Sequence, residues 1–336
     1  MKKLNVVQIG TGHDHAYAPV SLLPKREDIR FSGYVRVEGE TKTFDGVPEL
    51  SYNEVLSMRD LDAVFIETED QYLTKYAHEF VKRGIAVQMD KPGGQDKKSF
   101  DALFDLASEK GVPLHLGYMY RYNPAIKKVI GMVKNGDLGE IYYIEAQMNC
   151  FHPDEKRKWL KDYQGGMMNF LGCHLVDIVL QVQGVPDEII PYNAASEKQF
   201  GEDMGFAVFR YGDRCSFIKT TAVETGGFMR RQIVVCGEKG TVEIHPTEYF
   251  ADHGKLCSDV YITLDKSWSY KPDKISFGPY DRYGDMYDEF FKIVRGEMKN
   301  PYSYEYEKLL HDTLLKACGV KIQKEKDAFT KIKKEG

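Results

Sequence analysis

The chain begins with a predicted apolar strand, which is followed by a glycine turn and then by a helix. Leu4–Ile9 is apolar and of strand length, Gly10-Thr-Gly12 follows it, and a helical stretch begins at Ala16. Gly10 allows a tight turn, and Gly12 allows a pyrophosphate to approach the backbone at the helix N-terminus. This order predicts a dinucleotide-binding turn, although His15 stands where the usual fingerprint has its third glycine.

Strands and helices then continue to alternate as far as residue 116. Helical stretches open at capping residues such as Asp96 and end at glycines such as Gly84 and Gly111. The alternation predicts a doubly wound parallel sheet with helices on both faces, which is a Rossmann fold. The expected strands are Leu4–Ile9, Ile29–Val37, Ala63–Glu67, Ile85–Met89 and Val112–Leu116.

The fourth of these strands ends in Asp90-Lys91-Pro92 and two glycines. Pro92 keeps Lys91 out of helical geometry. Ligands of open parallel sheets bind just beyond the carboxyl ends of the strands. We therefore expect Lys91 to point its ammonium at bound substrate, although a lone lysine on a loop is usually solvated.

The end of the second strand bears on the choice of cofactor. An acidic residue there accepts hydrogen bonds from the 2′-hydroxyl of NAD, whereas an arginine pairs with the 2′-phosphate of NADP. The sequence offers both Arg36 and Glu38. We expect NAD or NADP, with a weak preference for NADP because of Arg36.

The pattern changes after a junction that holds Arg121 among three tyrosines. Six strand candidates follow between residues 141 and 245, with few helices and with hairpin-length turns such as Gly212-Asp213. This predicts a large, mostly antiparallel sheet. We place a Rossmann domain at residues 1–121 and an α+β domain for substrate and oligomer contacts at residues 122–336.

One almost wholly apolar helix, Gly165–Leu180, interrupts the strand series. Such a helix is buried, and its polar residues His174 and Asp177, three apart, share a face. Two readings stay open at this point. His174 is either a core histidine paired with Asp177 or a residue held in one tautomer and ready to move a proton.

Composition limits the class of protein. The 336 residues suit two domains, and 42% hydrophobic with 29% charged residues describe a soluble globular chain. A net charge of −5 gives no reason to expect nucleic acid or an anionic membrane as partner. The six cysteines form no Cys-x-x-Cys pair, and no apolar run approaches the ~20 residues of a membrane span. We expect a cytoplasmic protein with reduced thiols and without a signal peptide.

Taken together, these motifs resemble the Gfo/Idh/MocA family of glucose–fructose oxidoreductases and inositol dehydrogenases over nearly the whole chain. The shared landmarks are Gly10-Thr-Gly12, Asp90-Lys91-Pro92 and Gly165-Gly166…Gly172-Cys-His174-Leu-Val-Asp177. The resemblance implies that Lys91 contacts nicotinamide and substrate hydroxyl, and that His174 transfers the proton. It also implies a homodimer or homotetramer formed through the second-domain sheet.

The chain departs from the family pattern at one position in this helix. Many members carry an aspartate one turn before the histidine, and Phe170 stands there instead. This phenylalanine suggests a less polar substrate, altered chemistry or no turnover.

The resemblance and the local patterns give the following assignments. We assign catalysis to Lys91 and His174. The expected cofactor-binding residues are Gly10, Gly12, His13, Asp14, Arg36, Thr68, Asp90 and Lys91. The expected substrate-binding residues are Arg121, Asn149, His152, Trp159, Phe170 and His174. No metal site is expected, because two histidines on a phosphate-facing turn, His13 and His15, lack a full ligand set.

The leading prediction is an NAD(P)-dependent dehydrogenase that acts on a secondary hydroxyl of a sugar, polyol or inositol. An imidazole can accept the hydroxyl proton, an ammonium can stabilise the developing oxyanion, and the cofactor carries the hydride. One alternative is a redox-neutral glycosidase that uses bound NAD transiently. The other is a catalytically silent regulator that binds nucleotide or sugar, which Phe170 keeps open.

Overall fold

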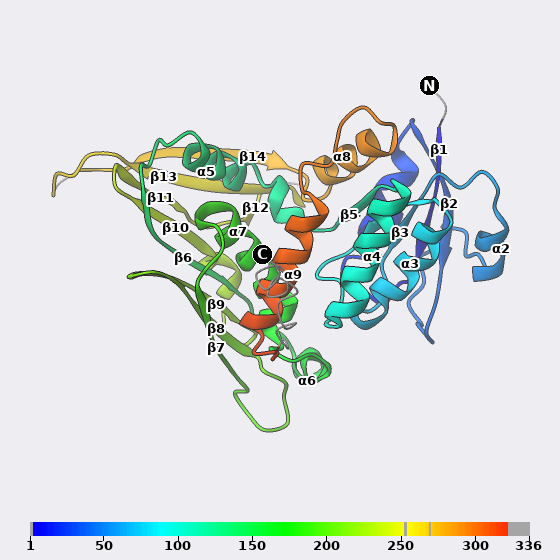
Figure 1. The fold of residues 1–336 in the computed structure, drawn as a ribbon, viewed down its shortest axis with the longest axis horizontal. Helices are drawn as coiled ribbons and strands as arrows, with labels where there is room; N and C mark the ends of the chain where they lie inside the picture. The colour runs from blue at the N-terminus through cyan, green and yellow to red at the C-terminus, as the bar shows by residue number, and fades with distance from the viewer. Residues whose placement is uncertain (1–2, 252–253, 269, 322–336) are drawn as a thin grey trace, which may run out of the picture.

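The computed structural model describes residues 3–251, 254–268 and 270–321, which form two β-sheets with helices packed on them (Figure 1). The predicted combination of a parallel Rossmann sheet and a large, mostly antiparallel sheet is confirmed. The division of the chain at residue 121 stays a prediction.

The first sheet has five parallel strands in the order β2-β1-β3-β4-β5. Its strands are β1 (Leu4–Ile9), β2 (Ile29–Val35), β3 (Ala63–Ile66), β4 (Ala86–Met89) and β5 (Leu114–Leu116). Its helices are α1 (Tyr17–Leu22), α2 (Tyr52–Ser57), α3 (Leu73–Lys82) and α4 (Lys97–Lys110). The chain runs from β1 outward to β2 and then returns to the other side of β1 at β3. The loops that follow β1 and β3 therefore flank the point where the strand order reverses, which is where ligands bind in such sheets.

Local chemistry fixes the ends of these helices. Ser51 and Glu54 form a reciprocal capping box at the start of α2, and the Asp96 carboxylate accepts the Lys98 N–H at the start of α4. Gly111 ends α4 with a φ of 63°, a left-handed conformation that glycine adopts without strain.

The second sheet has nine strands, and every pairing in it is antiparallel except that of β6 with β9. The strand order is β12-β13-β11-β10-β6-β9-β8-β7, and β14 pairs with β13. The strands are β6 (Ile141–Asn149), β7 (Glu188–Ala194), β8 (Met204–Tyr211), β9 (Arg214–Thr221), β10 (Gln232–Gly237), β11 (Gly240–Ile244), β12 (Tyr249–Phe250), β13 (Leu256–Thr263) and β14 (Asp273–Tyr280).

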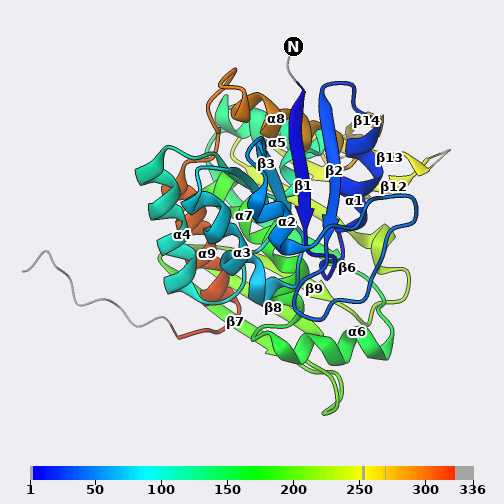
Figure 2. The ribbon, with the colours of Figure 1, turned by 90° about the vertical axis from the view of Figure 1, so that its right-hand side faces the viewer.

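The last two helices of the described chain join the two sheets. The later helices are α5 (Pro124–Lys134), α6 (Asp154–Trp159), α7 (Cys173–Gln183), α8 (Gly284–Val294) and α9 (Tyr304–Ala317). Figure 1 shows α8 and α9, in orange and red, between the sheets, and Figure 2 shows them from the side of the first sheet. Rings of Tyr287, Phe290 and Phe291 on α8 pack against Phe65 of β3, while α9 packs against α4 and α7. Across the described ranges, every helix is too short or too polar to cross a bilayer.

Three segments differ from the sequence predictions. The strand predicted as Ile29–Val37 stops at Val35. The stretch Gly165–Leu180 is not one uniform α-helix, because a π-helical turn at Met168–Gly172 precedes α7. The polar stretch after Pro153, for which we predicted no helix, contains α6. Acidic residues in its first turn and basic residues in its last turn complement the helix dipole, which explains a helix with little apolar periodicity.

Candidate active site

Lys91 lies directly after β4 and is almost completely buried. Its ammonium donates a hydrogen bond of 2.8 Å to the main-chain carbonyl of Phe170 and lies 4.6 Å from the centre of the Phe170 ring. Burial lowers the pKa of Lys91, but the nearby Cys173, Asp70 and Asp90 outweigh it, and the net pKa is raised. Lys91 is therefore a buried, charged ammonium anchored on the turn that precedes α7.

The π-helical turn Met168–Gly172 brings this anchor into position. A π turn departs from the regular α-helical hydrogen-bond ladder, and such turns occur frequently at functional sites. The carbonyl of Phe170 lies within it and faces Lys91, with the Cys173 thiol 3.5 Å away. His174 follows one helical turn later.

His174 is 1% exposed, and neither of its ring nitrogens has a hydrogen-bond partner within the described residues. The ring packs edge-on against Tyr118 and Tyr120, with centroids 5.6 and 4.8 Å apart. Burial, followed by the charges of Lys91 and His15, lowers the pKa of His174 well below its usual value. The imidazole is therefore neutral, and a buried polar group without a partner requires an explanation.

Asp177 does not supply that missing partner, so the core-histidine reading of His174 fails on this geometry. The Asp177 carboxylate accepts two hydrogen bonds of 3.0 Å from Arg121 and one of 2.7 Å from Tyr306. Arg121 also donates to Glu307 over 2.6 and 2.9 Å. Arg121 and both carboxylates are buried, so this arginine, which we expected to bind substrate, lies inside an ion cluster.

The glycine turn after β1 has the shape and the donors of an anion site. Gly10 has a φ of +93°, and a Cβ there would lie 2.4 Å from the Thr68 nitrogen. The backbone N–H groups of Thr11 and Gly12 donate to the Glu40 carboxylate over 2.7 and 3.0 Å, and the Thr68 hydroxyl donates over 2.7 Å. The turn thus already holds an anionic group, and these donors fit the phosphates of a dinucleotide.

The residues predicted to choose between NAD and NADP lie beyond the end of β2. Arg36 is 37% exposed and pairs with Glu49 over 2.8 Å. Glu38 accepts hydrogen bonds from Lys75 and Tyr76. Neither side chain contacts the glycine turn; that contact belongs to Glu40.

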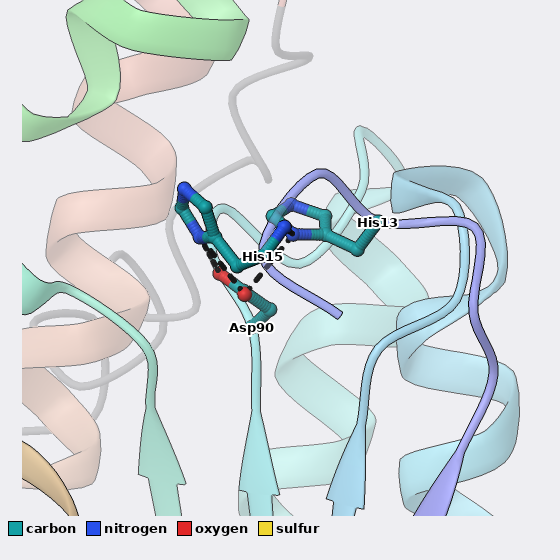
Figure 3. Close-up of side chains that lie close together, drawn as sticks. All are labelled: His13, His15 and Asp90. Atoms are coloured by element: carbon teal, nitrogen blue, oxygen red, sulfur yellow. Dashed lines mark hydrogen bonds and ion pairs between the residues drawn. The ribbon is translucent and has the colours of Figure 1, made fainter. Parts of the chain in front are cut away.

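Two histidines of the turn converge on Asp90 at the end of β4 (Figure 3). Nδ1 of His13 and Nδ1 of His15 each lie 3.0 Å from Oδ2 of Asp90, and Nε2 of His13 lies 3.4 Å from Asp70. Burial opposes the charge of His13, but Asp90 and Asp70 raise its pKa to about 9. Burial lowers the pKa of His15 to about 4 and raises that of Glu67.

A cavity of about 370 Å³ opens between the glycine turn and α6. Its lining comes from both domains: Gly12, His13, Asp14, Glu69, Asp70, Pro153, Glu155, Lys156, Trp159 and Phe170. Lys156 reaches across this cavity. Its ammonium pairs with Asp14 over 3.0 Å. The same ammonium lies 3.6 Å from the centre of the Trp159 ring and 4.4 Å from the centre of the Phe170 ring. The Phe170 ring therefore lines the cavity and contacts the ammonium groups of both Lys156 and Lys91.

The predicted substrate-binding residues do not all reach this cavity. Trp159 and Phe170 line it, and the His152 ring lies 5.9 Å from that of Phe170. Asn149 is fully buried and donates to Gln147. Sequence reasoning did not assign Glu40, Glu67 or Asp70 to the site. The only available signals were an acidic residue just past β2 and polar residues just past β3.

Comparison with known proteins identifies relatives of the same architecture. A sequence profile described as "Oxidoreductase family, C-terminal alpha/beta domain", of the Gfo/Idh/MocA group, matches residues 130–305, more than half of the chain. D-xylose 1-dehydrogenase (NADP(+)) 2 of Haloferax volcanii is 26% identical over 43% of this chain and 45% of its own length. The chain spans about half the length of the curated relatives that it matches.

Two solved structures share the fold over nearly their whole length. An NADPH-dependent oxidoreductase structure from Desulfitobacterium hafniense superposes with a TM-score of 0.80 at 16% identity and covers 95% of both chains. The aldose-aldose oxidoreductase of Caulobacter crescentus gives a TM-score of 0.78 at 16% identity and covers 95% of this chain and 98% of its own. At these identities the likeness establishes the fold alone.

Proposed function

Because this chain belongs to the Gfo/Idh/MocA oxidoreductase family, we propose that it transfers hydride between a nicotinamide cofactor and a secondary hydroxyl of a sugar or polyol. One observation carries the proposal: His174 is buried and neutral, without a hydrogen-bond partner in the described chain, within the field of the Lys91 ammonium. Relatives named for xylose and aldose chemistry support this class of substrate.

The two catalytic side chains have complementary tasks. A bound nicotinamide would accept or donate the hydride. His174 accepts the hydroxyl proton during oxidation and returns it during reduction, because a neutral imidazole has a free lone pair. Lys91 stabilises the negative charge that develops on the substrate oxygen. Both groups are buried, so these electrostatic effects act at low dielectric.

The main-chain carbonyl of Phe170 anchors Lys91 in place of an aspartate side chain. Where the family pattern has an aspartate, this chain presents an apolar ring, but the main-chain oxygen of the same residue accepts the Lys91 hydrogen bond. A carbonyl holds an ammonium in place without adding a negative charge. The substitution is therefore compatible with hydride transfer, and the ring makes the wall of the substrate cavity apolar.

The glycine turn would hold the dinucleotide through Gly10, Gly12 and Thr68, with His13 and Asp14 beside it. NADP is our preferred cofactor, because Arg36 lies exposed near the end of β2 and relatives are named for NADP or NADPH. Glu40 opposes this preference, since its carboxylate lies on the turn and would repel a 2′-phosphate.

The substrate would enter through the cavity between the turn and α6. Trp159 offers an aromatic face and Lys156 a cation, both suited to a hydroxylated ring. The Phe170 ring contacts both the Lys156 and the Lys91 ammonium, so the substrate hydroxyl would approach Lys91 beside this ring.

The experiment that tests this function is a panel of sugars and polyols assayed with NAD and NADP through the absorbance of the reduced nicotinamide. Net reduction of free cofactor by one substrate class supports the dehydrogenase. Glycoside hydrolysis that requires NAD without net NADH formation would instead support the redox-neutral glycosidase. Ligand binding without turnover of any kind would support the silent regulator.

We propose that the second sheet also forms the contact between subunits. Strand register places five exposed apolar side chains on the same face, opposite the helix α7: Tyr143, Ile190, Tyr192, Phe206 and Phe217. An exposed apolar patch of this kind marks an interaction surface. A homodimer or homotetramer that covers this face is the assembly we expect.

A further inference from the structure

We propose that His13, His15 and Asp90, together with Glu67, form a binding site for one divalent transition-metal ion at the carboxyl edge of the first sheet. The inference goes beyond hydride transfer and does not depend on it. It differs from our expectation from the sequence, in which the two histidines of the turn lacked a full ligand set.

The ligand atoms converge as a metal requires. One nitrogen of each imidazole and a carboxylate oxygen of Asp90 all lie within 4.8 Å of one another (Figure 3). Two of these separations, from Asp90 Oδ2 to each Nδ1, are 3.0 Å. A tetrahedral ion with bonds of ~2.0–2.1 Å holds its ligand atoms ~3.3 Å apart. If Asp90 moved by a few tenths of an ångström, both separations would therefore match those between the ligands of a tetrahedral ion.

Hydrogen bonds alone leave part of this cluster unsatisfied. Oε2 of Glu67 is buried and has no hydrogen-bond partner in the described part of the chain, and the buried Nε2 of His13 has only the 3.4 Å contact with Asp70, which lacks hydrogen-bond geometry. The same Glu67 oxygen lies 3.9 Å from Nδ1 of His13, which is also the nitrogen that contacts Asp90. Glu67 is thus a buried carboxyl group that can supply a fourth ligand.

The local charge also favours a divalent cation. Glu67, Asp70 and Asp90 are buried side by side around His13, and Lys91 is the one ammonium buried with them within the described residues. Buried charges are normally paired or bound to a metal. Metal binding displaces protons from its ligand groups, so a divalent ion would replace protons as the positive charge among these carboxylates.

An ion can reach the site from solvent. His13 and Asp70 line the cavity between the glycine turn and α6, and the His15 side chain is 16% exposed. The ligands come from three loops at one sheet edge, after β1, β3 and β4. A rigid sheet holds such loops in place, which makes the site preformed.

The ligand types select the class of ion. Imidazole nitrogens with carboxylate oxygens suit Zn²⁺, Fe²⁺ or Co²⁺, whereas Mg²⁺ prefers a shell of oxygens and retains its waters. We therefore expect Zn²⁺ and Co²⁺ to bind and Mg²⁺ not to compete.

The test uses the full-length, tag-free chain after treatment with a chelator, without cofactor or substrate. Zn²⁺ binding is measured by calorimetry and by metal analysis after desalting, and Co²⁺ binding by visible absorption. The variants are His15→Gln and His13→Gln, and the control is His245→Gln, because His245 is 44% exposed and lies far along the chain, directly after β11. The expected result is one ion per chain for wild type and control, with at least tenfold weaker binding in both cluster variants.

Three outcomes would overturn the site. The wild-type chain could retain no stoichiometric ion, the cluster variants could bind as tightly as the control, or the Co²⁺ spectrum could show thiolate ligation, which would assign the ion to cysteines. The spectrum of the wild-type chain decides the ligand type even if a variant fails to fold. None of these outcomes bears on turnover of cofactor, so the failure of this site and that of the proposed activity are distinguishable.

Discussion

The ammonium of Lys91 donates a 2.8 Å hydrogen bond to the main-chain carbonyl of Phe170. The contact joins the end of β4 in the first sheet to the π-helical turn before α7 in the second domain. It fixes the ammonium close to His174 without an acidic side chain. The positions of both proposed catalytic groups therefore depend on the packing between domains, and the following predictions test the parts of that arrangement.

Arg121 should matter for stability. Replacement by methionine leaves Asp177 and Glu307 buried without their cation, so we expect the free energy of unfolding to fall by about 3–5 kcal/mol. Denaturant unfolding measures this change. Arg30→Met is the matched control, because Arg30 is 55% exposed in its pair with Asp60 and should contribute less than about 1 kcal/mol. Equal, small losses for both variants would show that the ion cluster does not stabilise the fold.

Glu40 should oppose the binding of NADP. Glu40→Gln removes the carboxylate from the glycine turn, so we expect the Kd for NADPH to fall about tenfold, equivalent to about 1.4 kcal/mol. Arg36→Ala, by contrast, should weaken NADPH more than NADH. Fluorescence titration of the reduced cofactors measures both. Weaker binding in Glu40→Gln would make Glu40 a ribose-binding residue, and equal losses in Arg36→Ala would remove the preference for NADP.

The pH dependence of oxidation should reflect the lowered pKa of His174. A base with a lowered pKa becomes protonated, and so unable to accept a proton, only at lower pH. We therefore expect kcat/KM to stay level as pH falls through about 6.5. The raised pKa of Lys91 keeps its ammonium charged over the same range. A pH profile of kcat/KM measures this. An acid limb centred near or above pH 6.5 would be inconsistent with a buried, neutral His174.

The exposed face of the second sheet should control assembly. Phe217→Lys places a charge in the middle of the apolar face and should shift the chain to monomer in size-exclusion chromatography with light scattering. Val185→Lys is the control, since Val185 is 60% exposed just after α7 and outside that face. A wild-type chain that is already monomeric at micromolar concentration would contradict the proposed contact.

The strands and helices of the first sheet were predictable because their signals are local. Apolar runs, capping residues and glycine C-caps mark the elements without reference to the rest of the chain. The error at the end of β2 shows the limit of such signals. The strand stops at Val35, and Glu38 adopts a left-handed φ of 51°, which a sequence pattern does not reveal for a residue other than glycine.

The site was less predictable because it depends on contacts between distant segments. Asp90 meets His15 across 75 positions, and Arg121 meets Glu307 across 186. Residue type indicated that Lys91 and His174 were candidates. Only the three-dimensional packing shows that Asp177 is already occupied, that Glu40 lies on the turn, and that Glu67 lies 3.9 Å from His13.

The most direct test of the proposed catalytic pair is single-turnover hydride transfer by Lys91→Ala and His174→Ala on a substrate that the sugar panel identifies. We predict at least a hundredfold loss of the rate in each variant, with the Kd for cofactor unchanged in His174→Ala and wild-type rates in His78→Ala, whose side chain is exposed on α3. Rates within a few-fold of wild type in both Lys91→Ala and His174→Ala would contradict the assignment.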